Sequence, residues 1–297
     1  MRFGAWGTGA DESSAANPPS DHYPPAMPIL AFCLFLLTAF LYSAVGHGGA
    51  SGYLAAMALM GVEPALMKPV SLSLNVLVSL IATVQFGRAG HFRWRLFWPF
   101  AVMSVPAAMV GGAIDLPGWA YRPLIGAVLL FSAWRLLVTA SGPTIREPKL
   151  GDADQGVDPT PSPTGLTGTD LLPTPPPLPI ALAVGLGLGF LAGLSGTGGG
   201  IFLSPILLLL GWATPRQTAA VSALFILMNS LAGLGGLLLS GRPIPEEFAL
   251  WIAPWAGAAV IGGFLGSWLG ARRLSVSVLR RLLAAVLIIA GAKLIVS

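Results

Sequence analysis

The chain has 297 residues, of which 55% are hydrophobic and only 9% are charged, so it lacks the polar residues that cover a soluble domain. Its net charge of +4 does not indicate nucleic-acid binding, because the basic residues lie between apolar blocks. Those blocks run for roughly 15 to 22 residues, the length of a helix that crosses about 30 Å of hydrocarbon, and their lack of alternation argues against an outer-membrane barrel. We therefore predict an all-α polytopic protein of the inner or plasma membrane, with the lipid bilayer as a partner.

Residues 1–27 are predicted to be a disordered polar tail, since they lack the basic-then-apolar layout of a signal peptide. A first transmembrane repeat, 28–139, follows, and a second repeat spans 180–297. The segment 140–179 between them carries ten of the 26 prolines, which makes it a linker too polar for lipid and too proline-rich to fold alone. Each repeat reads as five helical elements, predicted near 28–45, 50–62, 69–87, 96–114 and 120–139, and near 180–195, 200–211, 217–239, 249–270 and 279–296.

The two halves resemble each other in sequence. Residues 46–49 align with 196–199, an offset of 196 − 46 = 150, and after a one-residue gap Pro64 aligns with Pro215 and Ser79 with Ser230. An internal duplication of this kind is frequent in transporters. Because five elements per half is an odd number, we predict that the repeats are inverted. The positive-inside rule agrees if the tail lies outside, because most arginines between apolar blocks then fall inside.

Two glycine clusters, 46–49 and 195–200, interrupt the apolar sequence at matching positions. Each glycine disfavours helix by about 1 kcal/mol relative to alanine, so we expect broken or re-entrant helices here. Unwound backbone must face protein or water, and the helix after each break begins with free N–H groups that attract anions. Two such ends near the midplane would form an anion site. Close helix packing is the alternative role, which we favour for Gly185, Gly187 and Gly189.

Small polar residues on the third element of each half could donate hydrogen bonds to an oxyanion, or could hold helices together at about 0.6 kcal/mol each. His47, which stands where the second half has Thr197, could bind an anion, relay protons or simply pack. Lys68 could attract an anion or extend to the membrane interface. The candidate substrate-binding residues are Gly46, His47, Gly48, Gly49, Ser71, Asn75, Ser195, Gly196, Thr197, Gly198, Gly199, Gly200, Ser222 and Asn229.

No carboxylate is predicted near the midplane, which disfavours cation coupling and divalent-metal transport. The three histidines, His22, His47 and His91, are not expected to converge on a metal. We therefore predict a permease without cofactor or metal and not an enzyme, whose partner is a small anion rather than a nucleic acid. Proton coupling and assembly into a homo-oligomer stay open.

The second glycine cluster, with Pro205 and the segment 218–222 after it, resembles the sulfite exporter TauE/SafE family of membrane permeases. The resemblance covers roughly 30–139 and 180–297. It implies transport of sulfite, sulfoacetate or another organosulfonate, and some members move other small organic anions. The first repeat departs from the commoner pattern, because it has His47 within its glycines and no proline where Pro205 stands.

A protease, a metal-ion permease and a structural scaffold are the alternative hypotheses. Ser195 within Gly193-Leu194-Ser195-Gly196 and His47 could form the nucleophile and base of an intramembrane serine protease, provided that the two side chains are in contact. That function gives no reason for the second repeat. A metal-ion permease would need clustered histidines, and a purely structural scaffold does not explain breaks at matching positions.

Overall fold

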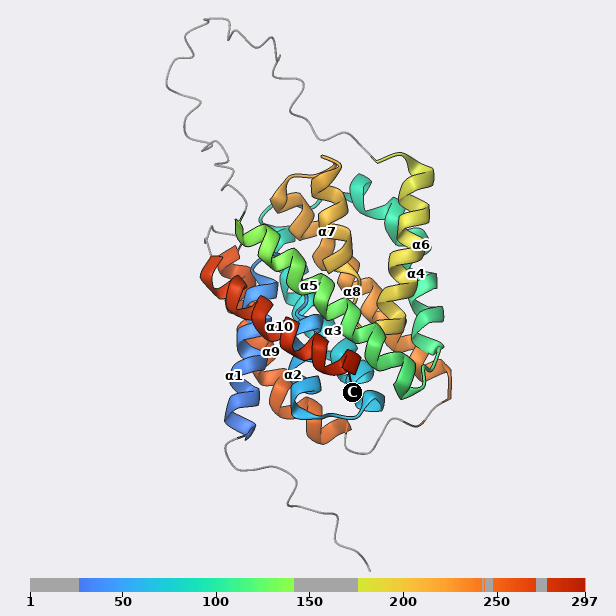
Figure 1. Ribbon diagram of the computed structural model, residues 1–297. Coiled ribbons are helices and arrows are strands. Elements are labelled where there is room, and N and C mark those ends of the chain that lie inside the picture. Colours follow the sequence, from blue (N-terminus) through green and yellow to red (C-terminus); the bar gives the residue numbers. More distant parts are fainter. Residues whose placement is uncertain (1–26, 142–175, 242, 244–247, 271–276, 297) are drawn as a thin grey trace, which may run out of the picture.

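The computed structural model describes residues 27–141, 176–241, 243, 248–270 and 277–296, so most of the predicted tail and linker lies outside the described residues. Within these ranges all the regular secondary structure is helical (Figure 1). The helices are α1 (Met27–Ser43), α2 (Ala50–Met60), α3 (Pro64–Arg88), α4 (Trp94–Ala113), α5 (Gly118–Ser141), α6 (Leu178–Ser195), α7 (Gly200–Leu209), α8 (Pro215–Leu239), α9 (Phe248–Gly270) and α10 (Ser277–Val296).

Each predicted element corresponds to one helix, and the largest error in a boundary is at α3. We expected this helix to start at Pro69, but it starts at Pro64, and Pro69 lies inside it. Pro64 occupies the first turn, where a missing N–H is harmless because that donor has no intrahelical partner. Pro69 lies one turn further along, so it removes only one hydrogen bond of a 25-residue helix.

Five of the described helices are long and apolar enough to cross a membrane: α3, α4, α6, α8 and, over Ile252–Gly270, α9. By contrast α2 and α7 have 11 and 10 residues. At about 1.5 Å per residue each reaches only about half of a 30 Å hydrocarbon core. These two are half-helices, as the glycine clusters predicted.

The half-helix α2 folds back along α1. Ser51 Oγ donates to Tyr42 Oη at 2.8 Å, and the ring of Tyr53 stacks on Phe35 at 5.3 Å between centroids. A Cβ on Gly52, between them, would lie 2.6 Å from Thr38. As the residue number rises in α2, the number of its partner falls in α1. The two elements therefore form an antiparallel hairpin with the glycine break at its tip.

Helices of the two halves pair with each other. Glycines of α6 lie against backbone carbonyls of α4, and glycines of α9 lie against carbonyls of α1, in both cases at every fourth residue: Gly185 on Phe100, Gly189 on Ser104, Gly193 on Ala108, and Gly262 on Leu36, Gly266 on Phe40, Gly270 on Ala44. The packing role predicted for Gly185 and Gly189 is confirmed, whereas Gly187 faces open space. Both pairs are parallel, and each is the counterpart of the other when the halves are aligned.

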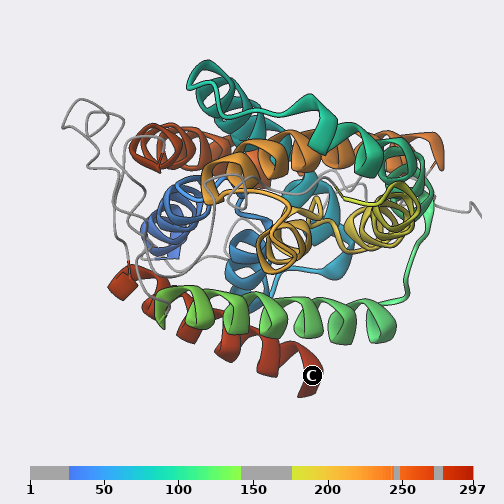
Figure 2. The ribbon, with the colours of Figure 1, turned by 90° about the horizontal axis from the view of Figure 1, so that it is seen from above.

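The direction of the helices is visible in Figure 1, where α1 begins at the lower end of the view and α6 at the upper end. An inverted relation of the complete halves stays a prediction. The helices α5 and α10 lie side by side across the front in Figure 1 and form one edge of the molecule when it is seen from above (Figure 2).

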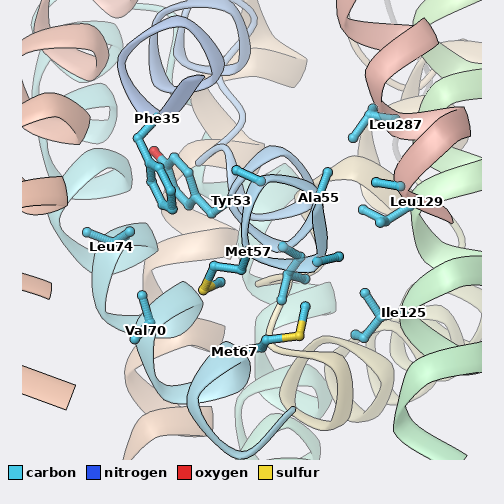
Figure 3. Packing of buried hydrophobic residues seen from close by; sticks show 14 of the residues in the cluster. Phe35, Tyr53, Ala55, Met57, Met67, Val70, Leu74, Ile125, Leu129 and Leu287 are labelled. Carbon is cyan, nitrogen blue, oxygen red and sulfur yellow. The ribbon is translucent and has the colours of Figure 1, made fainter. Parts of the chain in front are cut away.

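The main hydrophobic core surrounds α2. All residues from Ala50 to Ala58 are buried. Figure 3 shows Tyr53 and Met57 between Val70 of α3 on one side and Leu129 of α5 on the other. This packing fixes the half-helix, and with it the direction in which its N-terminus points.

Candidate functional site

Both glycine clusters interrupt the helices as predicted. The chain leaves helical geometry between α1 and α2 and between α6 and α7, and it adopts positive φ at Gly46 (75°), Gly49 (99°), Gly196 (81°), Gly198 (72°) and Gly199 (81°). A residue with a Cβ rarely adopts these angles, so glycine is required by the backbone itself. The matching segments 46–49 and 196–199, with three glycines each, therefore interrupt the helix in each half.

Four carbonyl groups at or beside the two breaks have side-chain hydrogen-bond donors. Around the first break, Val45 O lies 3.1 Å from His47 Nδ1, and Gly48 O accepts from Tyr53 Oη at 3.0 Å. Around the second, Ser195 O accepts from Tyr121 Oη at 3.1 Å and Gly196 O from Ser71 Oγ at 2.9 Å. Cations in proteins are held by such oxygen atoms. These four oxygens are therefore less available to a cation.

The N–H groups that follow the breaks are in the opposite situation. The N-cap residue of α2 is Gly49 and that of α7 is Gly199, and neither helix has a side-chain cap. The first hydrogen bonds after the breaks run from Tyr53 N to Gly49 O and from Phe202 N to Gly199 O. A helix start buried without a cap leaves donors and a partial positive charge facing inward.

The two breaks meet at a small cavity of about 10 Å³. It is lined by Tyr42, His47, Gly48, Gly49, Ala50, Ser51, Thr197, Ile201 and Ile226. The first residues of α2 and Ile201 of α7 belong to this wall, so both uncapped helix starts lie beside the same space. A volume of this size has room for about one water molecule.

The side-chain amide of Asn75 lies between the breaks. A Cβ on Gly48 would be 2.5 Å from its Oδ1, and a Cβ on Gly198 would be 3.1 Å from its Nδ2. Asn75 is completely buried, and among the described groups neither amide atom has a hydrogen-bond partner. Ser230 Oγ, also buried and without a partner there, lies close to Gly198. Buried polar groups are nearly always hydrogen-bonded, so this cluster is suited to a polar ligand.

Other predicted polar residues have structural partners. Ser71 donates to Gly196 O, Ser222 Oγ is 2.8 Å from Ser204 Oγ, and Asn229 Oδ1 accepts from Ser104 Oγ at 2.7 Å. Ser71 thereby joins α3 of the first half to the second break. The bonds of Ser222 and Asn229 hold α8 against α7 and α4. Of the predicted amides, Asn75 is the one that the structure brings between the two breaks.

The first break carries an imidazole side chain, that of His47, at the position where the second break has Thr197. His47 is half-buried and lines the cavity, and its Nδ1 carries the hydrogen in the bond to Val45 O, because a carbonyl can only accept. Thr197, at the matching position, also lines the cavity. Its Oγ1 is 2.8 Å from Ser195 Oγ, and Ser195 Oγ donates to Leu191 O at 2.6 Å. The Ser195 hydrogen is therefore directed at a helix carbonyl, which is unlike the arrangement of a serine nucleophile.

Lys68 has a role that the sequence did not reveal. It is buried, with 8% of its surface exposed, instead of extending to the interface. Its Nζ donates to Gly111 O, Gly112 O and Ile114 O at 3.2, 2.8 and 3.0 Å, so it caps the C-terminus of α4. Nothing in the local sequence predicts this contact, which joins residues more than forty positions apart. Within the described ranges no group of three or more His, Cys, Asp or Glu could hold a metal ion.

Comparisons with known proteins agree on the kind of protein. The profile of the family described as "Sulfite exporter TauE/SafE" matches residues 31–294. The chain is also 40% identical over 264 residues to "Probable membrane transporter protein y4hK" of Sinorhizobium fredii, a match that covers 88% of this chain and 95% of that protein. No solved structure matches the chain.

Proposed function

Because the chain belongs to the TauE/SafE sulfite exporter family, we propose that it carries a small sulfur oxyanion, sulfite or an organosulfonate, through a site at the two helix breaks. The chain is a multi-pass membrane transporter of the plasma membrane. The observation that carries the proposal is the pair of uncapped helix starts, α2 and α7, that lie beside one small cavity, near the buried amide of Asn75, which has no hydrogen-bond partner among the described groups.

The hydrogen-bond donors near the cavity favour a ligand with negative charge. Helix starts offer N–H donors and about half a positive charge each, and Asn75 adds two further donors. Four carbonyls at or beside the breaks are hydrogen-bonded to His47, Tyr53, Tyr121 and Ser71. An oxyanion with several acceptor oxygens complements this arrangement. Moving it outward from a negative interior releases about 2.3 kcal/mol per charge per 100 mV, so export needs no coupled ion.

The cavity has room for about one water molecule, whereas sulfite has four heavy atoms. The described conformation is therefore closed over the site, and binding requires the two breaks to separate. Separation exposes more backbone N–H groups to the ligand. This fits a transporter, in which the site opens to each side in turn.

The test is flux of radiolabelled sulfite and sulfoacetate into proteoliposomes under an imposed potential or pH gradient, for the wild type and Gly198→Leu. Gly198 has a φ of 72°, and a Cβ there would lie 2.7 Å from Ile226, so the substitution closes the site. Gly211→Leu is the control, because Gly211 has a φ of 65° with open space around it. We expect saturable flux in the wild type and the control and at least a hundredfold loss in Gly198→Leu.

A folded wild type that carries no sulfur oxyanion would contradict the substrate assignment and direct attention to carboxylates. Equal loss in both variants would show that backbone strain, rather than the site, causes the effect. The response of the wild-type flux to each gradient identifies the coupled ion, and loss of a pH response in His47→Gln would assign that coupling to His47.

A further inference from the structure

Ile226 stands at the position of the second half that matches Asn75 in the first. Pro64 aligns with Pro215 and Ser79 with Ser230, an offset of 151, and 75 + 151 = 226. The structure places both side chains at the same pair of matching glycines, Gly48 and Gly198. One position of the repeat thus carries an amide in one half and a branched alkyl group in the other.

Ile226 takes up the space that the glycines leave. A Cβ on Gly48 would be 3.0 Å from its Cγ2, one on Gly198 2.7 Å from the same atom, and one on Gly200 2.4 Å from its Cδ1. The side chain is 1% exposed and forms part of the cavity wall. Ile226 therefore fills space beside three glycines of the two breaks and contributes to the small volume of the cavity.

The cavity consequently has two unlike sides. Tyr42, His47, Ser51 and Thr197 supply its polar side, and Asn75, whose buried amide lacks partners among the described residues, lies against Gly48 of the same wall. Ile226 and Ile201 form an apolar side. An anion held by the helix starts and by Asn75 would direct its oxygens to the polar side and any organic substituent to the isoleucines.

We propose that Ile226 is the residue that limits the size of the organic substituent on the transported anion; this inference rests on the proposed function. Once the breaks have separated, a bare oxyanion has no organic substituent that would meet Ile226. A long alkyl group on sulfur does need it, and van der Waals overlap with a packed side chain excludes it. Removing carbons from Ile226 should admit longer sulfonates and leave the polar side unchanged.

The experiment compares sulfite, methanesulfonate and propanesulfonate flux in proteoliposomes for the wild type, Ile226→Val and Ile226→Ala. The quantity measured is the ratio of propanesulfonate to sulfite flux, which a general loss of folded protein does not alter. We expect the ratio to rise at least tenfold in Ile226→Ala and two- to threefold in Ile226→Val. Ile125→Ala removes the same atoms from a fully buried site on α5, away from the cavity lining, and should leave the ratio unchanged.

An unchanged ratio in both Ile226 variants, with sulfite still carried, would overturn the size limit and leave the proposed function intact. An equal rise in Ile125→Ala would overturn it too, because the effect would then reflect loosened packing in general. A wild type that carries no sulfur oxyanion would overturn the proposed function and this inference together. If Ile226→Ala does not fold, the smaller change expected in Ile226→Val decides.

Discussion

The described helix ends fall into two groups, those that a side chain caps and those that have no side-chain cap. At the start of α8, Thr214 Oγ1 accepts from Gln217 N and the Gln217 side chain accepts from Thr214 N, a reciprocal cap at the exposed surface. At C-termini, the buried Lys68 caps α4, and the exposed Lys293 donates from Nζ to Ala58 O and Leu59 O at the end of α2. The buried starts of α2 and α7 have no side-chain cap.

The contrast lies in burial. The starts of α3, α4 and α6 also lack a side-chain cap, but the residues at those starts are largely exposed. The starts of α2 and α7 lack a side-chain cap although they are buried. Orphan donors at a buried helix start cost stability, so their occurrence at both matching positions supports the proposed anion site.

The largest effect on stability is expected at a capped end. Lys68→Met keeps the length of the side chain but removes three charged hydrogen bonds to the last carbonyls of α4. Hydrogen bonds to charged groups contribute about 1.5–3 kcal/mol each, and water can replace part of that, so we expect a loss of about 3 kcal/mol. Thermal unfolding in detergent measures it. A change below about 0.5 kcal/mol, the scale of an ordinary surface substitution, would show that this cap is dispensable.

A medium effect of opposite sign is expected beside the uncapped ends. Asn75→Leu removes a buried amide without partners among the described groups, so the free energy of unfolding should rise by about 1 kcal/mol. Transport should fall about tenfold, which corresponds to about 1.4 kcal/mol of lost anion binding. Asn229→Leu is the stability control. Its Oδ1 accepts from Ser104, so that variant should be destabilised. A destabilised Asn75→Leu would mean that the amide serves the fold.

The smallest effect is expected at the exposed cap. Thr214→Ala removes the oxygen that accepts from Gln217 N, and loss of an N-cap costs about 1 kcal/mol. Transport per folded molecule should not change, because this end lies away from the cavity lining. Unfolding and flux of the same preparation provide the two readouts. A fall in specific flux would remove the distinction between the two groups of ends.

Much of the fold could be predicted because membrane helices are long apolar blocks separated by polar or glycine-rich segments. The starts of α2 and α7 were predicted to the residue, since each follows a glycine cluster. The start of α3 was missed because two prolines, Pro64 and Pro69, compete as the first-turn residue, and tertiary packing selected the earlier one. The two-half organisation was visible as well, while the exchange of partners between halves was not, because α4 and α6 carry no sequence signal for each other.

The site could be predicted only in part. The glycine clusters could be recognised because several glycines close together inside an apolar block disfavour a continuous helix. The sequence does not distinguish polar residues that bind a ligand from those that join helices, because Asn75, Ser222 and Asn229 all lie within apolar helices. The structure shows that Ser222 and Asn229 are hydrogen-bonded to neighbouring helices. Ile226 was missed since an isoleucine in a membrane helix is unremarkable until its alignment with Asn75 and its contacts are both known.

The glycine-to-carbonyl contacts of α6 on α4 and of α9 on α1 have a mechanical consequence. No side chain separates the backbones at Gly189 and Ser104 or at Gly266 and Phe40, so neither pair can slide without a collision. Each pair joins a helix of one half to a helix of the other. A rocking motion that carried one half of the sequence away as a single body would split both pairs. We therefore expect each mixed pair to move as a unit, with bending in the segments that connect the pairs to the two half-helices.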